Sequence, residues 1–318
     1  MLGSVGLGGL NRRLNRRPCV PALAWAVLLV LLSWAVPAPV LLQAAAQITP
    51  AAPPARYVIV LSLDGARGDA MAAALPQSLA ARGAVSWTAQ TTSPSSTLPA
   101  HASMLSGVGP AVHRVTFNDW SIGEPYFTRT TIFTEVTRAG GRAVALVAKP
   151  KMMFLMPPGS VASAQHLLYP RFRQADVVET AARLFGEQRP AVLFVHVADP
   201  DDTGHRRGWM SEEYLRVIAA APALIERFLR AFDDAGVAAQ ALLIVTSDHG
   251  GHGITHGTSR PEDMTIPWMA FGGAARRGVV VDRRIVVFDT AATALAALGI
   301  PIPGDWQGRP VLEALQSP

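Results

Sequence analysis

The chain has 318 residues, half of them hydrophobic, so it can form one large α/β domain or two small ones, and its composition argues against disorder. Its formal net charge is +5, but residues 1–46 hold four arginines and no acidic residue, which leaves +1 for the remainder. This near-neutral balance gives no basis for a nucleic-acid-binding surface, and we predict no nucleic-acid partner.

Residues 1–46 are predicted to be a targeting segment. A basic stretch with four arginines precedes an apolar run over 22–36, and three alanines end at residue 46. This order is typical of a cleaved signal peptide, but the uncharged stretch 20–46 also nearly suffices for a retained membrane anchor. We therefore expect an exported protein, periplasmic or secreted, or alternatively one anchored to the inner membrane. Membrane contact is expected only through this segment, if it is not cleaved.

A short linker over 47–56, rich in alanine and proline, leads to a domain over 57–318. The only cysteine, Cys19, lies in the targeting segment, so the mature chain cannot form disulfides.

Within the domain, short apolar runs alternate with stretches of helical spacing. The runs are 57–63, 143–147, 191–197, 241–245 and 266–271. Helical spacing is clearest over 175–185 and 213–235. This β–α alternation predicts a mostly parallel central sheet sandwiched by helices on both faces.

A glycine-rich loop over 246–257 follows the fourth apolar run and concentrates ligand-type side chains. It contains Asp248, His249, His252 and His256, which include three of the eight histidines in the chain. Imidazole nitrogens and carboxylate oxygens are ligands that Zn²⁺ selects. The loop therefore predicts a metal site or half of one, and the alternative is a solvated polar loop.

Two other runs are also followed by candidate ligands. Asp64 follows the first, and Asp201 and His205 lie in D-P-D-D-T-G-H after the third. Ligands of open α/β sheets bind beyond the carboxyl ends of the strands, so these segments are expected to meet at one edge. Six ligands suit two cations a few ångströms apart. Each residue also has a structural alternative: Asp64 as a helix cap, Asp201 or Asp202 in an Asx turn, and His205 as a surface residue.

A hydroxyl-rich turn, T-T-S-P-S-S-T-L-P, supplies a candidate nucleophile. Thr97 is preferred, and Ser95 or Ser96 could replace it. A threonine hydroxyl is a poor nucleophile at its free pKa, and coordination to a divalent cation activates it. The alternative is a helix cap region without chemistry.

These motifs, taken together and in order, resemble the type I phosphodiesterase/nucleotide pyrophosphatase family of the alkaline phosphatase superfamily. The matching pieces are S-L-D-G-A-R, S-T-L-P-A-H, H-R-V-T-F-N-D, P-D-D-T-G-H, S-D-H-G and T-H-G, followed by P-E-D-M-T-I-P-W-M-A-F-G and a C-terminal tail that resembles the closing helix and strand of the superfamily. The resemblance spans about 57–312. It implies an alkaline-phosphatase-like fold with a small or absent cap, because the chain is short for the family.

The resemblance also implies two divalent metal ions, with Zn²⁺ as the first choice. The first ligand set is Asp64, Asp248, His249 and the Thr97 oxygen, and the second is Asp201, His205 and His256.

Two further residues have implied or suggested roles. Asn118 matches the position that hydrogen-bonds a phosphoryl oxygen, with an asparagine turn as its alternative. Lys149, after the run 143–147, is a weaker candidate for substrate contact. The implied reaction is two in-line displacements, in which Thr97 attacks phosphorus and hydroxide then attacks the phospho-threonine. His252 is left without a ligand role.

The predicted function is an exported two-metal hydrolase that cleaves phosphodiester or pyrophosphate bonds in a small-molecule phosphate ester. A phosphomonoesterase, a phosphonate hydrolase and a phosphoryl-group transferase acting on envelope lipid or glycan are alternatives on the same site. A noncatalytic metal- or phosphate-binding protein and a structural envelope domain belong to other classes. A formylglycine sulfatase is disfavoured, since the mature chain has no cysteine. Ser96 and Ala100 differ from the Lys and Asn common in relatives with nucleotide substrates, which concerns substrate choice.

Overall fold

The computed structural model describes residues 55–317, so the predicted targeting segment and nearly all of the linker lie outside the described residues. The strands are β1 (Tyr57–Leu63), β2 (Ala84–Gln90), β3 (Ala143–Val147), β4 (Ser163–His166), β5 (Val192–Val197), β6 (Ala241–Thr246), β7 (Thr265–Phe271) and β8 (Val279–Val280). The helices are α1 (Gly68–Ala74), α2 (Gln77–Ala80), α3 (Thr97–Ser106), α4 (Pro110–His113), α5 (Ile132–Arg138), α6 (Gln174–Gln188), α7 (Asp199–Arg207), α8 (Glu212–Ile218), α9 (Ala221–Asp234), α10 (Pro261–Met264) and α11 (Asp289–Ala297). Short 3-10 helices cover Pro150–Leu155, Ala238–Gln240 and Leu312–Ala314.

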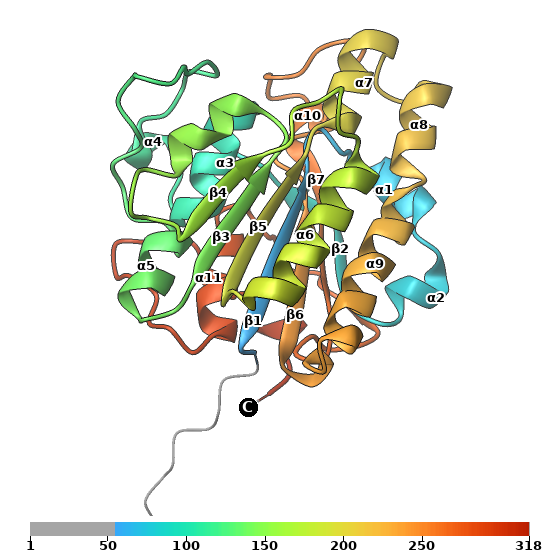
Figure 1. The fold of residues 1–318 in the computed structure, drawn as a ribbon. Helices are drawn as coiled ribbons and strands as arrows, with labels where there is room; N and C mark the ends of the chain where they lie inside the picture. The colour runs from blue at the N-terminus through green and yellow to red at the C-terminus, as the bar shows by residue number, and fades with distance from the viewer. Residues whose placement is uncertain (1–54, 318) are drawn as a thin grey trace, which may run out of the picture. The chain divides into compact units, whose positions relative to one another are not determined.

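The strands form one sheet with the order β4-β3-β5-β1-β6-β7-β2-β8. All neighbours pair in parallel except β7, which runs antiparallel to both β6 and β2. Helices lie on both faces of this sheet (Figure 1). The predicted mostly parallel sheet between two helical layers is confirmed.

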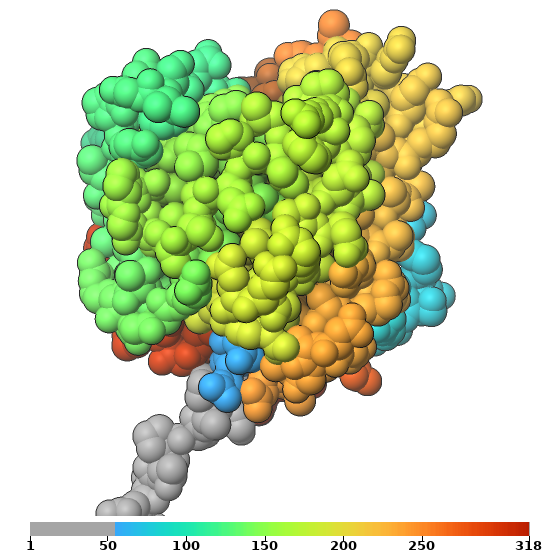
Figure 2. All heavy atoms as spheres, viewed as in Figure 1, coloured from blue at the N-terminus to red at the C-terminus, as the bar shows by residue number. Residues whose placement is uncertain are grey.

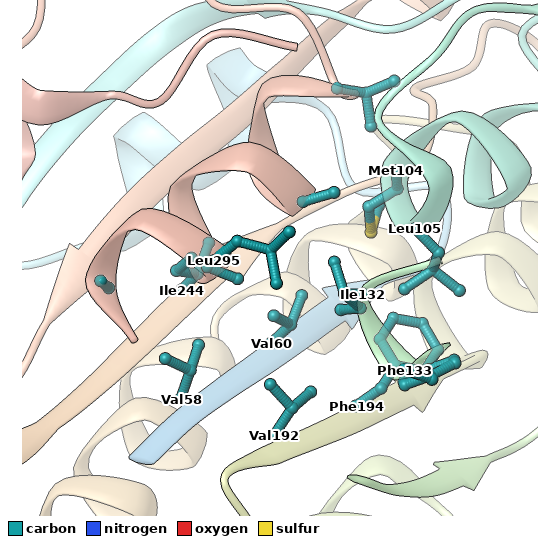
Figure 3. Packing of buried hydrophobic residues seen from close by; sticks show 14 of the residues in the cluster. Val58, Val60, Met104, Leu105, Ile132, Phe133, Val192, Phe194, Ile244 and Leu295 are labelled. Carbon is teal, nitrogen blue, oxygen red and sulfur yellow. The ribbon is translucent and has the colours of Figure 1, made fainter. Parts of the chain in front are cut away.

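Alternate residues of β1 point into two separate hydrophobic cores, as strand geometry requires. Val58 and Val60 belong to the core under α3, α5 and α11, which Figure 3 shows with Phe133 and Phe194. Ile59 and Leu61 belong to the core under α1, α6, α8 and α9. In the space-filling view only the start of β1 is visible, and atoms in the colour of α6 lie in front of the rest of the strand (Figure 2). Burial on both faces explains why the central strands read as continuous apolar runs.

The helical stretch predicted over 213–235 is two helices, α8 and α9, separated at 219–220. Pro222 lies in the first turn of α9, where its missing N–H costs nothing, whereas inside one long helix it would remove a hydrogen bond. The C-terminal tail forms α11. In place of a closing strand, Leu315 near the end of the tail pairs with Ala275 in an isolated bridge. Over the described residues 55–317, the helices are too short or too polar to cross a membrane.

Candidate active site

The three segments that carry the predicted ligands meet at the carboxyl edge of the sheet. Strands β5, β1 and β6 are adjacent and parallel, so the residues that follow them emerge side by side. Asp64 directly follows β1, Asp201 lies in the first turn of α7 after β5, and Asp248 lies two residues beyond β6. All three carboxylates are buried.

Gly65 allows the turn after β1 to touch α7. Its φ is +75°, and a Cβ there would lie 2.8 Å from the Cα of Asp201. At this contact the Asp201 N–H donates to the Asp64 carbonyl at 2.9 Å, and the Gly65 N–H donates to Asp248 Oδ1 at 3.1 Å. One glycine therefore fixes the spacing of the three acidic residues, because other residues would meet both strain and a steric clash.

Buried ligand-type atoms converge around His249 without hydrogen-bond partners among the described residues. They are Asp64 Oδ1, Asp248 Oδ2 and His249 Nε2, and Thr97 Oγ1 at the start of α3 is also buried and unpartnered. His249 Nε2 lies 3.4 Å from Asp64 Oδ1 and 3.3 Å from Asp248 Oδ2. Buried polar atoms are almost always paired, so such a convergence points to a cation as the missing partner.

A second group forms around Asp201. Its Oδ1, also unpartnered, lies 3.4 Å from His205 Nε2 and 3.6 Å from His256 Nε2. Their ligand atoms lie within 4.8 Å of one another, as do those of Asp64, Asp201 and His249. The structure thus brings together the six predicted carboxylate and imidazole ligands, and Asp201 lies within reach of both groups.

The three candidate histidine ligands share one orientation. His249 Nδ1 lies 2.8 Å from the Gly250 carbonyl oxygen, His205 Nδ1 lies 2.9 Å from that of Ile254, and His256 Nδ1 lies 2.9 Å from that of Ser95. A carbonyl only accepts, so each Nδ1 carries a proton, and in the neutral ring each Nε2 keeps its lone pair. This arrangement is common for metal-binding histidines. The pKa of His256 is lowered to about 4, mainly by burial and secondly by the neighbouring His249, so its ring is neutral.

His252 does not join either group. Its Nδ1 lies 2.7 Å from Asp263 Oδ1, and Asp263 Oδ2 accepts from the N–H and hydroxyl of Thr258. These bonds tie the glycine-rich loop to α10, so the histidine holds the loop in place.

Lys149 lies between two of the carboxylates, a position that the sequence only hinted at. Its Nζ is 2.6 Å from Asp64 Oδ2 and 2.6 Å from Asp201 Oδ2. These are the oxygens opposite to the unpartnered Oδ1 atoms. Burial opposes ionisation of Asp64, yet the Lys149 ammonium and the His196 ring N–H together hold its pKa well below the usual range. The sequence did contain a signal, because Lys149 and Lys151 are its only lysines.

Two buried histidines were missed by the sequence reasoning. His196 Nε2 lies 2.9 Å from Asp64 Oδ2. His101 Nδ1 lies 2.8 Å from the Thr97 carbonyl oxygen and 3.3 Å from Asp248 Oδ2, while its Nε2 is 2.8 Å from Ser62 Oγ. Burial lowers the pKa of both rings, so they are neutral and orient their neighbours. Helical spacing was the available signal for His101, because i and i+4 share a face.

Asn118 lies next to Thr97 through the backbone of α3. Its Oδ1 accepts from the Leu98 N–H at 3.0 Å, which leaves the side-chain amide to donate elsewhere. The Lys151 ammonium donates to the Asn118 carbonyl at 3.0 Å.

A recess of about 520 Å³ begins at the residues on either side of Asn118. Its lining includes the aromatic side chains Phe117, Trp120, Tyr126, Phe127 and Phe154. Edge-to-face contacts hold several of these rings, such as the 5.4 Å pair of Phe117 and Phe154. The recess can therefore accept an apolar or aromatic group beside the candidate phosphoryl site.

Comparison with protein families gives a match to the model described as type I phosphodiesterase/nucleotide pyrophosphatase, over residues 58–265. This range contains every candidate ligand and Thr97.

Two curated proteins match parts of the chain. Over 135 residues the chain is 30% identical to the phosphopentomutase of Symbiobacterium thermophilum, covering 41% of this chain and 31% of that protein. Over 131 residues it is 27% identical to the extracellular sulfatase SULF-1 homolog of Drosophila melanogaster, covering 39% and 12%. The chain thus spans less than a third of the length of either relative.

Solved structures share the fold at low sequence identity. Murine ectonucleotide pyrophosphatase/phosphodiesterase 5, an inactive variant in complex with AMP, gives a TM-score of 0.66 at 16% identity, covering 82% of this chain and 100% of that one. The human protein gives 0.67 at 16% identity, with the same coverage. A 2-O GAG sulfatase gives 0.66 at 14% identity, covering 81% and 73%. These likenesses confirm the alkaline-phosphatase-like α/β fold.

Proposed function

The chain belongs to the type I phosphodiesterase/nucleotide pyrophosphatase family, and on that premise we propose that it hydrolyses phosphodiester or pyrophosphate bonds through a covalent intermediate on Thr97. Family membership makes it a metal-dependent phosphoric ester hydrolase of the alkaline phosphatase superfamily. The proposal adds two zinc ions and the roles of individual residues.

The observation that carries the proposal is the convergence of three buried, unpartnered atoms from Asp64, Asp248 and His249, together with the likewise buried and unpartnered Thr97 Oγ1 at the start of α3. Nitrogen and oxygen donors in a compact set fit Zn²⁺. Asp201, His205 and His256 would hold a second ion. When bound, the ions supply positive charge that stabilises the phosphoryl group in transfer and favours the threonine alkoxide.

Three residues of the chain have roles in the proposed reaction: Thr97, Asn118 and His101. Thr97 Oγ1 forms a bond to phosphorus while the bond from phosphorus to the leaving oxygen breaks, and the hydroxyl proton passes through water to that oxygen. Water next cleaves the threonine–phosphorus ester and restores the Thr97 hydroxyl. In both steps the Asn118 amide donates to a phosphoryl oxygen as charge develops there. The His101 ring holds the Thr97 carbonyl, which positions the nucleophile at the start of α3.

One comparison supports this assignment. The murine structural neighbour is inactive as a threonine-to-alanine variant and binds AMP, a nucleotide phosphate ester. By analogy, the aromatic recess beside Asn118 would receive the organic part of a small-molecule phosphate ester. Access to this recess would favour substrates that carry a ring or another apolar group on one ester oxygen.

We further propose that residues 1–46 direct export to the periplasm or beyond, on the basis of their basic and apolar sequence pattern. Cell fractionation with N-terminal sequencing tests this. A cytoplasmic protein that retains its first residues would contradict it.

The decisive experiment compares the zinc-loaded wild type with Thr97→Ala on bis-p-nitrophenyl phosphate, a nucleotide p-nitrophenyl ester and p-nitrophenyl phosphate. We expect diester cleavage by the wild type and a loss of roughly 10⁴-fold or more in the variant, which should still bind metal. Thr88→Ala, an exposed threonine on β2, is the matched control. Monoester preference by orders of magnitude would overturn the diesterase assignment, and an active Thr97→Ala would overturn the nucleophile.

A further inference from the structure

Trp209 is a buried residue at the end of α7 to which neither the sequence motifs nor the proposed mechanism gives a role. Its side chain is 6% exposed. It follows Gly208, which ends the helix with φ +93°. The indole lies beside the second ligand group, with its ring centroid 5.0 Å from that of His205 and 5.9 Å from that of His256.

Two hydrogen bonds join Trp209 to separate segments of the site. Its indole Nε1–H donates to the Gly65 carbonyl at 2.9 Å, and its backbone N–H donates to the Gly253 carbonyl at 2.7 Å. The Gly65 carbonyl also accepts from the Tyr214 hydroxyl at 2.9 Å. One residue thus connects the turn after β1, α7 and the glycine-rich loop.

The indole also fits against two glycines that no other residue could replace. A Cβ at Gly204 would come within 2.5 Å of ring atoms of Trp209, and a Cβ at Gly251 would come within 2.2 Å. Gly204 directly precedes His205, and Gly251 lies between His249 and His256 in the chain. The ring therefore sets how closely α7 and the glycine-rich loop approach each other.

We propose that Trp209 is a positioning residue for the two metal sites. It touches neither ion nor substrate, and it fixes the relative placement of the three segments that bring Asp64, His205 and His256 together. This inference rests on the proposed function, because it concerns the ligands of that same site. Groups that orient metal ligands from behind commonly change metal affinity by 10–100-fold when removed.

The test measures metal binding by the full chain, independently of catalysis. Dissociation constants for Zn²⁺ are determined by chelator competition, and Co²⁺-loaded protein is examined by visible absorption, which reports coordination geometry. Trp209→Ala removes the ring, Trp209→Phe keeps an aromatic ring but removes the bond to Gly65, and Trp87→Phe on β2 is the matched control.

We expect Trp209→Ala to weaken zinc binding by about 10–100-fold and Trp209→Phe by about threefold to tenfold, the value of one hydrogen bond. Both should change the Co²⁺ spectrum, and Trp87→Phe should match the wild type. If Trp209→Ala does not fold, the zinc affinity and Co²⁺ spectrum of Trp209→Phe alone test the inference. Wild-type affinity and spectrum in Trp209→Phe would overturn the inference and leave the proposed function intact. A wild type that binds no metal would overturn both.

Discussion

Replacing Lys149 by methionine should destabilise the metal-free protein strongly. The ammonium is the common partner of Asp64 Oδ2 and Asp201 Oδ2, at 2.6 Å from each, and its side chain is only 19% exposed. Methionine keeps much of the volume of the side chain but leaves two carboxylates facing each other without the cation between them.

The magnitude follows from the cost of a broken buried ion pair. At 2.6 Å and an effective dielectric of about 20, each attraction is about 6 kcal/mol before the desolvation of the ammonium is subtracted. Removing one partner of a buried pair costs about 3–5 kcal/mol net. For a domain of this size, that lowers Tm by about 10 °C.

The assay is thermal unfolding of wild type and variant, in a chelator and again with saturating zinc. Zinc should raise the Tm of Lys149→Met more than that of the wild type, because the bound cations compensate the same carboxylates. Lys151→Met is the matched control, since Lys151 donates one hydrogen bond to the Asn118 carbonyl and should cost about 1 kcal/mol. The reasoning is refuted if the two variants have the same Tm in chelator.

Two further changes test other parts of the site. Asn118→Ala should lower kcat on diesters by about 10²–10³-fold with little change in KM, and Thr88→Ala should not; equal losses in steady-state kinetics would count against a phosphoryl contact. The pKa of His113 is lowered from 6.5 to about 4, mainly by burial and secondly by the Arg129 charge, so the folded protein favours the neutral ring. The stability that neutral His113 contributes is then fully present above pH 6.5. The free energy of unfolding falls by about 2.5 kcal/mol when the pH is lowered to 4.5. His113→Gln should remove that part of the loss in chemical denaturation, and an unchanged pH dependence would contradict the assignment.

Sequence reasoning succeeded where burial on both faces leaves a continuous apolar run. Strands β1 and β3 have the predicted bounds, and β5, β6 and β7 differ from them by one residue at one end. Strands β2 and β4 were missed, because they lie toward the edges of the sheet and contain polar residues, as in S-A-Q-H. The break between α8 and α9 was missed because its apolar spacing continues across Pro222.

The ligand set was predictable for a topological reason, and its partners were not. Parallel strands place their carboxyl ends at one edge, so Asp64, Asp201 and Asp248 could be grouped before any coordinates. The groups that orient the ligands are backbone carbonyls from other segments, such as that of Ser95 for His256, and carbonyls carry no sequence signal. The position of Lys149 between two carboxylates likewise depends on distances that only the fold sets.

The direction of β1 places Ala55 and the candidate ligands at opposite ends of the described domain. The chain enters the described domain at Ala55, runs through the seven residues of β1 and reaches Asp64 at the opposite edge of the sheet, roughly 25 Å away. Figure 1 shows the start of β1 and helices α7 and α10 at opposite ends of the molecule. Substrates that reach the candidate ligands would thus approach the sheet from the edge opposite to the start of β1.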